Sequence, residues 1–275
     1  MIRDITFGQY YPGDSVIHRL DPRVKIIWTL VYLVMIFFVR DFIGYAIILL
    51  MLAGTIKAAG IPFKYVARGM KPIAFILALT LILNLFLFDG KVLLELGPLQ
   101  ITDKGVHQAV FIAFRLVLLI FGTSLLTYTT KPMQLTDGFE YLMGPLAKVG
   151  FPANEVAMMM SIALRFIPTL LEETDKIMKA QQARGADFET GNVITRIKSM
   201  IPLIIPLFVS SFRIAQELAM AMEARCYRGG KGRTRLHPMK YKKADYAAYA
   251  VTLIFAAVIV VQSRGILPLP MLWPR

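Results

Sequence analysis

Two short motifs in the chain carry side chains suited to recognising a partner protein. They consist of Ala183, Arg184 and Gly185, and of their near copy Ala224, Arg225 and Cys226. A guanidinium group offers five N–H donors in a planar fork, which suits a carboxylate or a row of carbonyl oxygens. The small alanine beside each arginine lets a partner approach closely. The chemistry that these motifs offer is therefore recognition through charge and hydrogen bonds.

Each motif also has a purely structural interpretation. An arginine at a helix C-terminus is favoured by roughly 0.3 to 1 kcal/mol because the last carbonyls carry partial negative charge. A glycine that follows can adopt the left-handed conformation that ends a helix. For one motif alone this interpretation is the commoner one, but two copies at successive helix ends favour docking. A third Ala-Arg-Gly, at 67–69, lies in a short loop beside Lys64 and Lys71 and is interpreted as cytosolic positive charge.

Side chains with catalytic potential lack the spacing that catalysis or metal binding needs. The histidines are far apart in the sequence, at His18, His107 and His237. No HxxxH or HExxH pattern and no GxxxxGK[ST] phosphate loop occurs in the sequence. The acidic candidates for a membrane-embedded, lipid-modifying enzyme are Asp137, Glu140 and Glu155. Because these carboxylates fit no known motif, we expect no catalytic residue, no metal site and no cofactor in this chain.

The composition indicates a membrane protein. Hydrophobic residues make up 56% of the 275 residues and the mean hydropathy is +0.59, too high for an ordinary water-soluble surface. Lys and Arg outnumber Asp and Glu by 31 to 18, so basic groups must cluster. The single cysteine, Cys226, excludes an internal disulfide and agrees with a reducing cytosolic side.

Five apolar runs are predicted to cross the membrane as helices. They are 26–39, 42–56, 72–88, 105–130 and 246–263. Several are shorter than the roughly 20 residues of a full span, so they require tilt or charged end residues that reach the lipid headgroups. For the first run, the side chains of Arg23, Lys25 and Arg40 can reach the headgroups. A sixth run, 199–212, carries two prolines and is predicted to be a partial or interfacial segment.

Basic residues near the span ends predict a cytosolic N-terminus. The cytosolic side then has Arg19, Arg23, Lys25, Lys57, Lys64, Arg68, Lys71 and the segment 131–243, and the other side has Arg40, Lys91, Lys104 and Arg264. We therefore predict an all-α polytopic membrane protein with about five transmembrane helices and cytosolic amphipathic helices. Its regions are four spans in 1–130, a cytosolic region at 131–243, and the last span at 244–275.

The cytosolic region is predicted to contain two long amphipathic helices, each ending in one of the arginine motifs. Apolar residues recur at helical spacing from Leu164 to Met178 and from Leu207 to Met222. The first helix is expected to begin or kink near Pro168 and to end at Gly185. Packing and kink positions are assigned to Pro168, Glu172, Met178, Leu218 and Met222. A shorter interfacial helix is expected to stop at Gly144 and Pro145.

Arg115 interrupts the fourth span, where an unpaired charge is costly. One interpretation is an intramembrane functional residue. The other is a structural pairing with a helix-end carbonyl or with an acidic side chain such as Asp103. For the family named below, the structural role is the expected one.

The sequence resembles the transmembrane T component of energy-coupling factor transporters, the vitamin and metal importers of bacteria and archaea. The resemblance covers essentially the whole chain. It rests on "GQYYPGDSVIHRLDPRVKI", "SIALRFIPTLLEETDKIMKAQQARGADF" and "PLFVSSFRIAQELAMAMEARCYRGG". The paired Ala-Arg-Gly motifs are its most specific part.

The resemblance implies a non-enzymatic subunit of a cell-membrane importer. Arg184 and Arg225 would each enter a groove on one of two cytosolic ATPase subunits, identical or distinct, which bind ATP and Mg²⁺. The helices that carry these arginines would cross as coupling helices, and a vitamin- or metal-binding S component would rest on their apolar faces. Apart from the resemblance, the position of the basic segment 225–243 just before a span favours contact with lipid headgroups or a partner over nucleic acid.

The second motif departs from the family pattern, because Cys226 stands where the family has glycine. Gly229 is therefore the expected cap of that helix. Two other functions stay open at this point: a substrate-binding ABC permease and a lipid-modifying enzyme. The sequence leaves the cargo open, and on the resemblance alone we favour a module shared among several S components over a dedicated importer.

Overall fold

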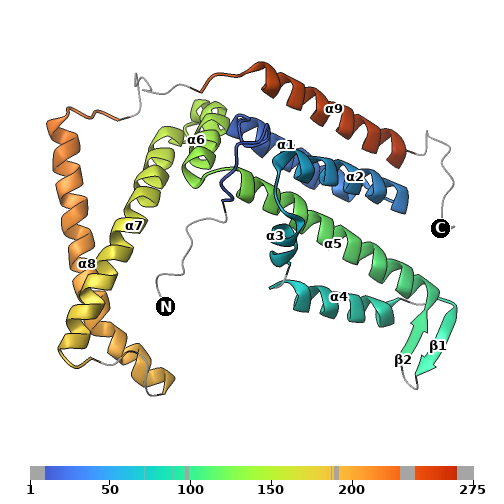
Figure 1. Ribbon diagram of the computed structural model, residues 1–275, viewed down its shortest axis with the longest axis horizontal. Helices are drawn as coiled ribbons and strands as arrows, with labels where there is room; N and C mark the ends of the chain where they lie inside the picture. The colour runs from blue at the N-terminus through green and yellow to red at the C-terminus, as the bar shows by residue number, and fades with distance from the viewer. Residues whose placement is uncertain are drawn as a thin grey trace. The chain divides into compact units, whose positions relative to one another are not determined.

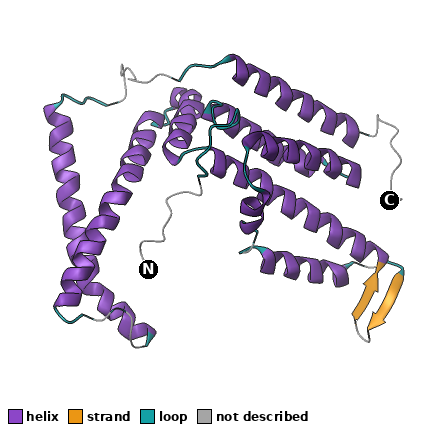
Figure 2. Ribbon diagram, viewed as in Figure 1, coloured by secondary structure: helices purple, strands orange, loops and turns teal. Residues whose placement is uncertain are grey.

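The computed structural model describes residues 10–264, apart from 71, 89, 97–98, 187, 189–191 and 230–238. His237, Lys71 and part of the basic segment 225–243 thus lie outside the described residues. Helices dominate the described chain, which confirms the predicted all-α class (Figures 1 and 2). The chain forms two compact units, divided after Gly138 and after Pro238. The predicted regions concern membrane and cytosol rather than compactness, so their boundaries stay predictions.

The first unit, here called the helix-bundle unit, contains the elements before Gly138 together with the last helix. Its elements are α1 (Pro22–Phe38), α2 (Phe42–Ala59), α3 (Phe63–Arg68), α4 (Ala74–Leu87), β1 (Val92–Leu96), β2 (Leu99–Thr102), α5 (Asp103–Thr129) and α9 (Lys243–Ser263). The strands form an antiparallel hairpin between α4 and α5 that the sequence analysis did not predict. Helix α5 contacts α1, α2 and α4, and α1 also contacts α9.

The core of this unit depends on a close approach of α1 to α5. The Tyr32 hydroxyl donates to the carbonyl oxygen of Leu118 at 2.6 Å. A Cβ atom built on Gly122 would lie 2.1 Å from Cε1 of Tyr32, so only glycine leaves room for the ring. Ile36, Ile48 and other fully buried side chains continue the core between α1, α2 and α5. Packing at this density makes the core intolerant of added volume.

A buried polar network joins the start of α1 to the start of α9. Oδ1 of Asp245 accepts from the backbone N–H of Asp21 at 2.8 Å, and Oδ2 accepts from the N–H of Lys242 at 2.7 Å. Asp21 caps α1 through the N–H of Arg23, and Pro22 takes the first helical position. The Arg23 side chain donates Nε–H to Asp21 at 3.1 Å and lies over the Tyr241 ring, 4.4 Å from its centre.

The expectation that Arg23 and Lys25 extend to the headgroups is wrong. Their side chains are buried, and Lys25 Nζ donates to the carbonyl oxygens of His18 and Thr129, at 3.0 and 2.9 Å. The Thr129 carbonyl ends α5, so the ammonium group lies at the negative end of that helix. Protein acceptors thus replace the headgroups that the sequence suggested.

Arg115 meets the end of α1. Its Nε–H donates to the Tyr45 hydroxyl at 3.0 Å, and one terminal N–H group lies 3.5 Å from the carbonyl oxygen of Val39, the C-cap of α1. The guanidinium carbon also lies 5.2 Å from the ring centre of Phe111. This is the pairing with a helix-end carbonyl that the structural interpretation predicts.

The second unit, here called the two-helix unit, is built on α7 (Ala153–Ala183) and α8 (Val193–Ala224). Helix α6 (Pro132–Met143) spans the division between the units, and the 3₁₀ helix η2 (Gly144–Val149) follows it at the predicted Gly144 stop. Helix α7 runs through Pro168 rather than beginning there. Residues 199–212 are the middle of α8 and not a separate segment, because the helix continues through Pro202 and Pro206.

Among the residues that the structure describes, five helices are long and apolar enough to cross a membrane. They are α2, α5, α7, Ile197–Ala224 within α8, and α9. Three of these match predicted spans, whereas the predicted runs 26–39 and 72–88 form helices of only 17 and 14 residues. Helices α7 and α8 are the least apolar of the five, with hydropathies of 1.2 and 1.5 against 1.9 to 2.3. The number of candidate spans therefore agrees with the prediction, but their identity differs in part.

Candidate docking site

The first arginine motif forms the complete C-terminal cap of α7. Ala183 is the last helical residue, Arg184 is the C-cap, and Gly185 has the predicted left-handed backbone, with φ of 89°. The N–H of Ala186 donates to the carbonyl oxygen of Gln181 at 3.0 Å, and the N–H of Gly185 donates to Gln182 at 2.9 Å. This pair of bonds is the Schellman motif, which satisfies the last carbonyls of the helix.

The second motif forms the same cap at the end of α8. Ala224 is the last helical residue and Arg225 is the C-cap. The N–H of Tyr227 donates to the carbonyl oxygen of Met222 at 3.0 Å, and the N–H of Cys226 donates to Glu223 at 2.8 Å. The two arginines therefore occupy equivalent positions in two equivalent motifs.

Cys226 itself has the left-handed backbone conformation that Gly185 has in the first motif, with φ of 57°. The expectation that Gly229 caps this helix is therefore wrong. Gly229 also has a positive φ, 88°, but it lies three residues beyond the cap. A side chain with a Cβ is disfavoured in this conformation, so the hydrogen bonds of the motif hold the cysteine in a strained backbone.

The third Ala-Arg-Gly copy has a different backbone. Gly69, at the end of the six-residue helix α3, has a right-handed φ of −62°. A Cβ atom on Gly69 would lie 2.8 Å from the Tyr128 hydroxyl, so this glycine provides space within the helix-bundle unit. The geometry thus separates the two arginine motifs of α7 and α8 from the copy at 67–69.

All six residues of the two motifs are exposed. Figure 1 draws the two-helix unit as a crossed pair, with the C-terminal ends of α7 and α8 at separate extremities. Near the crossing, the Ser210 hydroxyl donates to Oε1 of Glu173 at 3.4 Å, and Lys176 of α7 lies 3.8 Å from the same carboxylate. The arrangement presents two separate guanidinium groups rather than one shared cationic site.

The other residues assigned to this region differ in exposure. Met178, Leu218 and Met222 are half-buried, as packing positions require, whereas Pro168 and Glu172 are exposed. Arg213 and Glu217 of α8 are also exposed, so they form a solvated face and not a crossing contact. These placements leave the roles of the five assigned positions as predictions.

An apolar stripe on α8 is exposed along much of the helix. It consists of Ile197, Ile201, Ile204, Ile205, Phe208 and Phe212, between 49% and 63% exposed. The intervals of three and four residues place these side chains on one face. An apolar surface of this length on a helix marks an interaction with a protein or a membrane.

The sequence analysis missed the partnership of Asp21, Arg23 and Asp245. One signal was available: Asp245 stands directly before the last apolar run, where an acidic residue three positions after a helix N-cap can accept from the cap N–H. Its second bond, to Asp21, depends on a residue 224 positions away and has no local signal.

The chain is similar to known transport proteins over nearly its whole length. Residues 13–236 match the family described as CbiQ, cobalt transport protein. Relatives named energy-coupling factor transporter transmembrane protein EcfT are 55% identical over 255 residues in Thermosediminibacter oceani, and 43% over 260 in Bacillus subtilis. These alignments cover 93% and 94% of this chain and 96% and 98% of the respective relatives.

Proposed function

The chain belongs to the CbiQ family, as a multi-pass transmembrane component of energy-coupling factor transporters, and on that premise we propose that it couples two ATPase subunits to an S component. Arg184 and Arg225 each dock into one cytosolic ATPase subunit. ATP and Mg²⁺ are bound and hydrolysed in those partners, and this chain transmits their movement. The N-terminus and the two-helix unit then face the cytosol of a bacterial or archaeal cell, so that α7 and α8, the least apolar of the candidate spans, lie outside the hydrocarbon core in this proposal.

The observation that carries the proposal is the pair of matched helix ends. Both arginines are C-cap residues of a Schellman motif, and both are exposed. Because the cap bonds satisfy the helix carbonyls, the guanidinium groups remain available for a partner. Two separate helix ends support two ATPase subunits, one at each end.

The apolar stripe of α8 supports a second contact, with the S component. Phe208 and Ile205 are 63% and 59% exposed, and their neighbours on the stripe are exposed as well. Exposed methionines accompany them, including Met159 on α7 and Met220 on α8. Flexible thioether side chains adapt to different partner surfaces, which suits a module shared among several S components.

The test is co-purification of the tagged chain with its partner subunits from cells that express all of them. The double variant Arg184→Glu/Arg225→Glu is compared with wild type. Arg165→Glu/Arg213→Glu is the matched control, because it makes the same charge change at exposed positions along the same helices, away from their ends. We expect the first variant to lose ATPase subunits and the control to retain them.

Single variants refine the result. Arg184→Glu and Arg225→Glu should each lower the ATPase content by one subunit, or abolish uptake while assembly persists. If the double variant assembles and transports as wild type does, the two arginines are helix caps only and the docking proposal is abandoned. Recovery of more than one kind of S component with the wild-type chain would support the shared module.

A further inference from the structure

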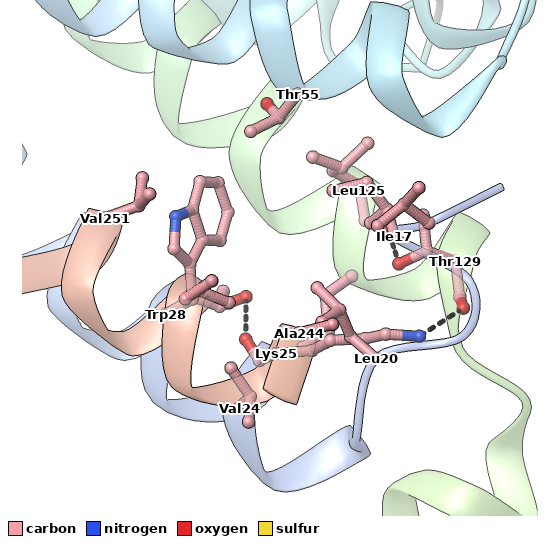
Figure 3. Close-up of a pocket in the computed structure, with 15 residues that line it drawn as sticks. Ile17, Leu20, Val24, Lys25, Trp28, Thr55, Leu125, Thr129, Ala244 and Val251 are labelled. Carbon is pink, nitrogen blue, oxygen red and sulfur yellow. Dashed lines mark hydrogen bonds between the residues drawn. The ribbon is translucent and has the colours of Figure 1, made fainter. Parts of the chain in front are cut away.

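The helix-bundle unit contains an apolar cavity of about 290 Å³ that the docking proposal does not use. Its walls come from residues 16–20, the first turns of α1 and α9, the end of α5 and Thr55 near the end of α2 (Figure 3). Because two helices begin and two end there, the cavity lies at one end of the bundle. The buried network of Asp21, Arg23 and Asp245 closes that same end.

Most of the cavity wall is hydrocarbon. It includes Ile17, Leu20, Trp28, Leu125 and Val251. The Trp28 ring stacks on Tyr32, with centroids 5.3 Å apart, which fixes its position. Helix α9 contributes three alanines, Ala244, Ala247 and Ala248, and their small side chains leave the volume open.

The polar groups of the wall are directed to carbonyl oxygens of the protein. The hydroxyls of Thr29, Thr55 and Thr129 each donate within their own helices, at 2.8 Å. The Lys25 stem lines the cavity while its ammonium group donates to His18 and Thr129 (Figure 3). The wall therefore favours an occupant without hydrogen-bonding groups.

Water is a poor occupant of this cavity, because its wall offers few groups for hydrogen bonding. The bundle belongs to a multi-pass membrane protein, so lipid hydrocarbon surrounds it. The volume of about 290 Å³ lies just below the range of about 300 to 1,000 Å³ typical of small-molecule sites, which suits a single hydrocarbon chain.

Exposed cations surround the same end of the bundle. Arg19, Lys57, Lys242 and Lys243 are exposed, whereas Asp21 and Asp245 are buried and hydrogen-bonded within the protein. An anionic headgroup is attracted to such a surface by about 1 kcal/mol per basic residue in juxtamembrane segments generally. We propose that the cavity binds one acyl chain of an anionic membrane lipid, with its headgroup among these cations.

The proposal is tested with the full-length chain in nanodiscs that contain phosphatidylglycerol carrying a diazirine on its acyl chain. After illumination, labelled peptides are mapped by mass spectrometry. We expect label on the α1 segment around Trp28 and on residues 244–251. Ala248→Phe should lower this labelling about tenfold, because losing room for two methylene groups has roughly that effect. Ala250→Phe is the matched control on the same helix, since Ala250 is exposed and does not line the cavity.

Equal labelling of the lining in the two phenylalanine variants would contradict the proposal. So would a wild-type pattern in which other helices are labelled and the lining is not, a result that does not depend on how any variant folds. Loss of labelling when partner subunits are co-assembled would identify a protein segment as the occupant and overturn the lipid assignment. Equal labelling by a phosphatidylcholine probe would contradict the proposal that the headgroup must be anionic.

Discussion

The two units of the chain differ in where their charged residues lie. In the helix-bundle unit, Arg23 and Asp245 are only 2% and 1% exposed, and protein groups bind both. In the two-helix unit, the described charged residues are exposed or half-buried, and a contact between α7 and α8 joins the Ser210 hydroxyl to Glu173 at 3.4 Å. Both units expose apolar side chains, but only the helix-bundle unit has buried charged residues among those that the structure describes, and its own groups bind them.

This difference indicates that the helix-bundle unit determines the stability of the chain and that the two-helix unit binds its partners. Removing a buried carboxylate or adding volume in the bundle should affect folding. Substituting exposed side chains of the two-helix unit away from its helix caps should affect partner binding with little change in the stability of the isolated chain. The four predictions that follow test this contrast, beginning with the largest expected effect.

Asp245→Ala should lower the free energy of unfolding by about 2 to 5 kcal/mol, because two backbone N–H groups, of Asp21 and Lys242, lose their acceptor. Glu172→Ala, which removes an exposed carboxylate from α7, should change it by less than about 0.5 kcal/mol. Chemical denaturation in detergent measures both. Equal effects would remove the contrast between the units.

Gly122→Ala should destabilise the bundle by about 1 to 3 kcal/mol, since the added methyl group collides with Tyr32. Gly54→Ala is the matched control in α2, where a Cβ atom meets nothing within 4 Å. Alanine there should be neutral or stabilising by up to about 1 kcal/mol, owing to its higher helix propensity. Thermal melting of the two variants in the same detergent separates packing from propensity.

Substitutions at the equivalent cap positions of α7 and α8 should change the stability of the chain in opposite directions. Gly185→Ala places a side chain at φ of 89° and should cost about 1 kcal/mol, whereas Cys226→Gly should stabilise by a similar amount. The measurement is the shift in melting temperature of each variant. If Cys226→Gly were destabilising, the thiol itself would have to stabilise the end of α8.

Phe208→Ser should change the stability of the isolated chain by less than about 0.5 kcal/mol, because this ring is 63% exposed. The same substitution should reduce the S component recovered in co-purification and lower uptake. Glu217→Ser, at an exposed charged position on the same helix, is the control and should leave both unchanged. A large loss of stability in Phe208→Ser would show that the stripe is part of the chain's own core.

The sequence predicted local features of this fold well. The Gly185 end of α7 and the stop at Gly144 both depend on residues close together in the chain. Capping is a local interaction, so a few adjacent residues are enough to indicate it. The class of protein followed from composition alone.

Features that depend on distant residues or on helix continuity were predicted less well. Prolines at 168, 202 and 206 suggested interruptions, yet α7 and α8 continue through them, because a helix can lose one backbone hydrogen bond where its other contacts persist. Lys25 was assigned to the headgroups because its acceptor, the carbonyl of Thr129, is 104 residues away. The equivalence of the two caps was also hidden, since Cys226 does not suggest a left-handed backbone.

The bond between Asp21 and Asp245 has a consequence for biosynthesis. The two residues are separated by 224 positions, so the first helix is made long before the carboxylate that its N-terminal N–H requires. Until α9 has been synthesised, the backbone N–H of Asp21 must donate to water, to lipid headgroups or to the insertion machinery. We therefore expect α7 and α8 to emerge from the ribosome while the bundle is still open, and the last helix to complete it.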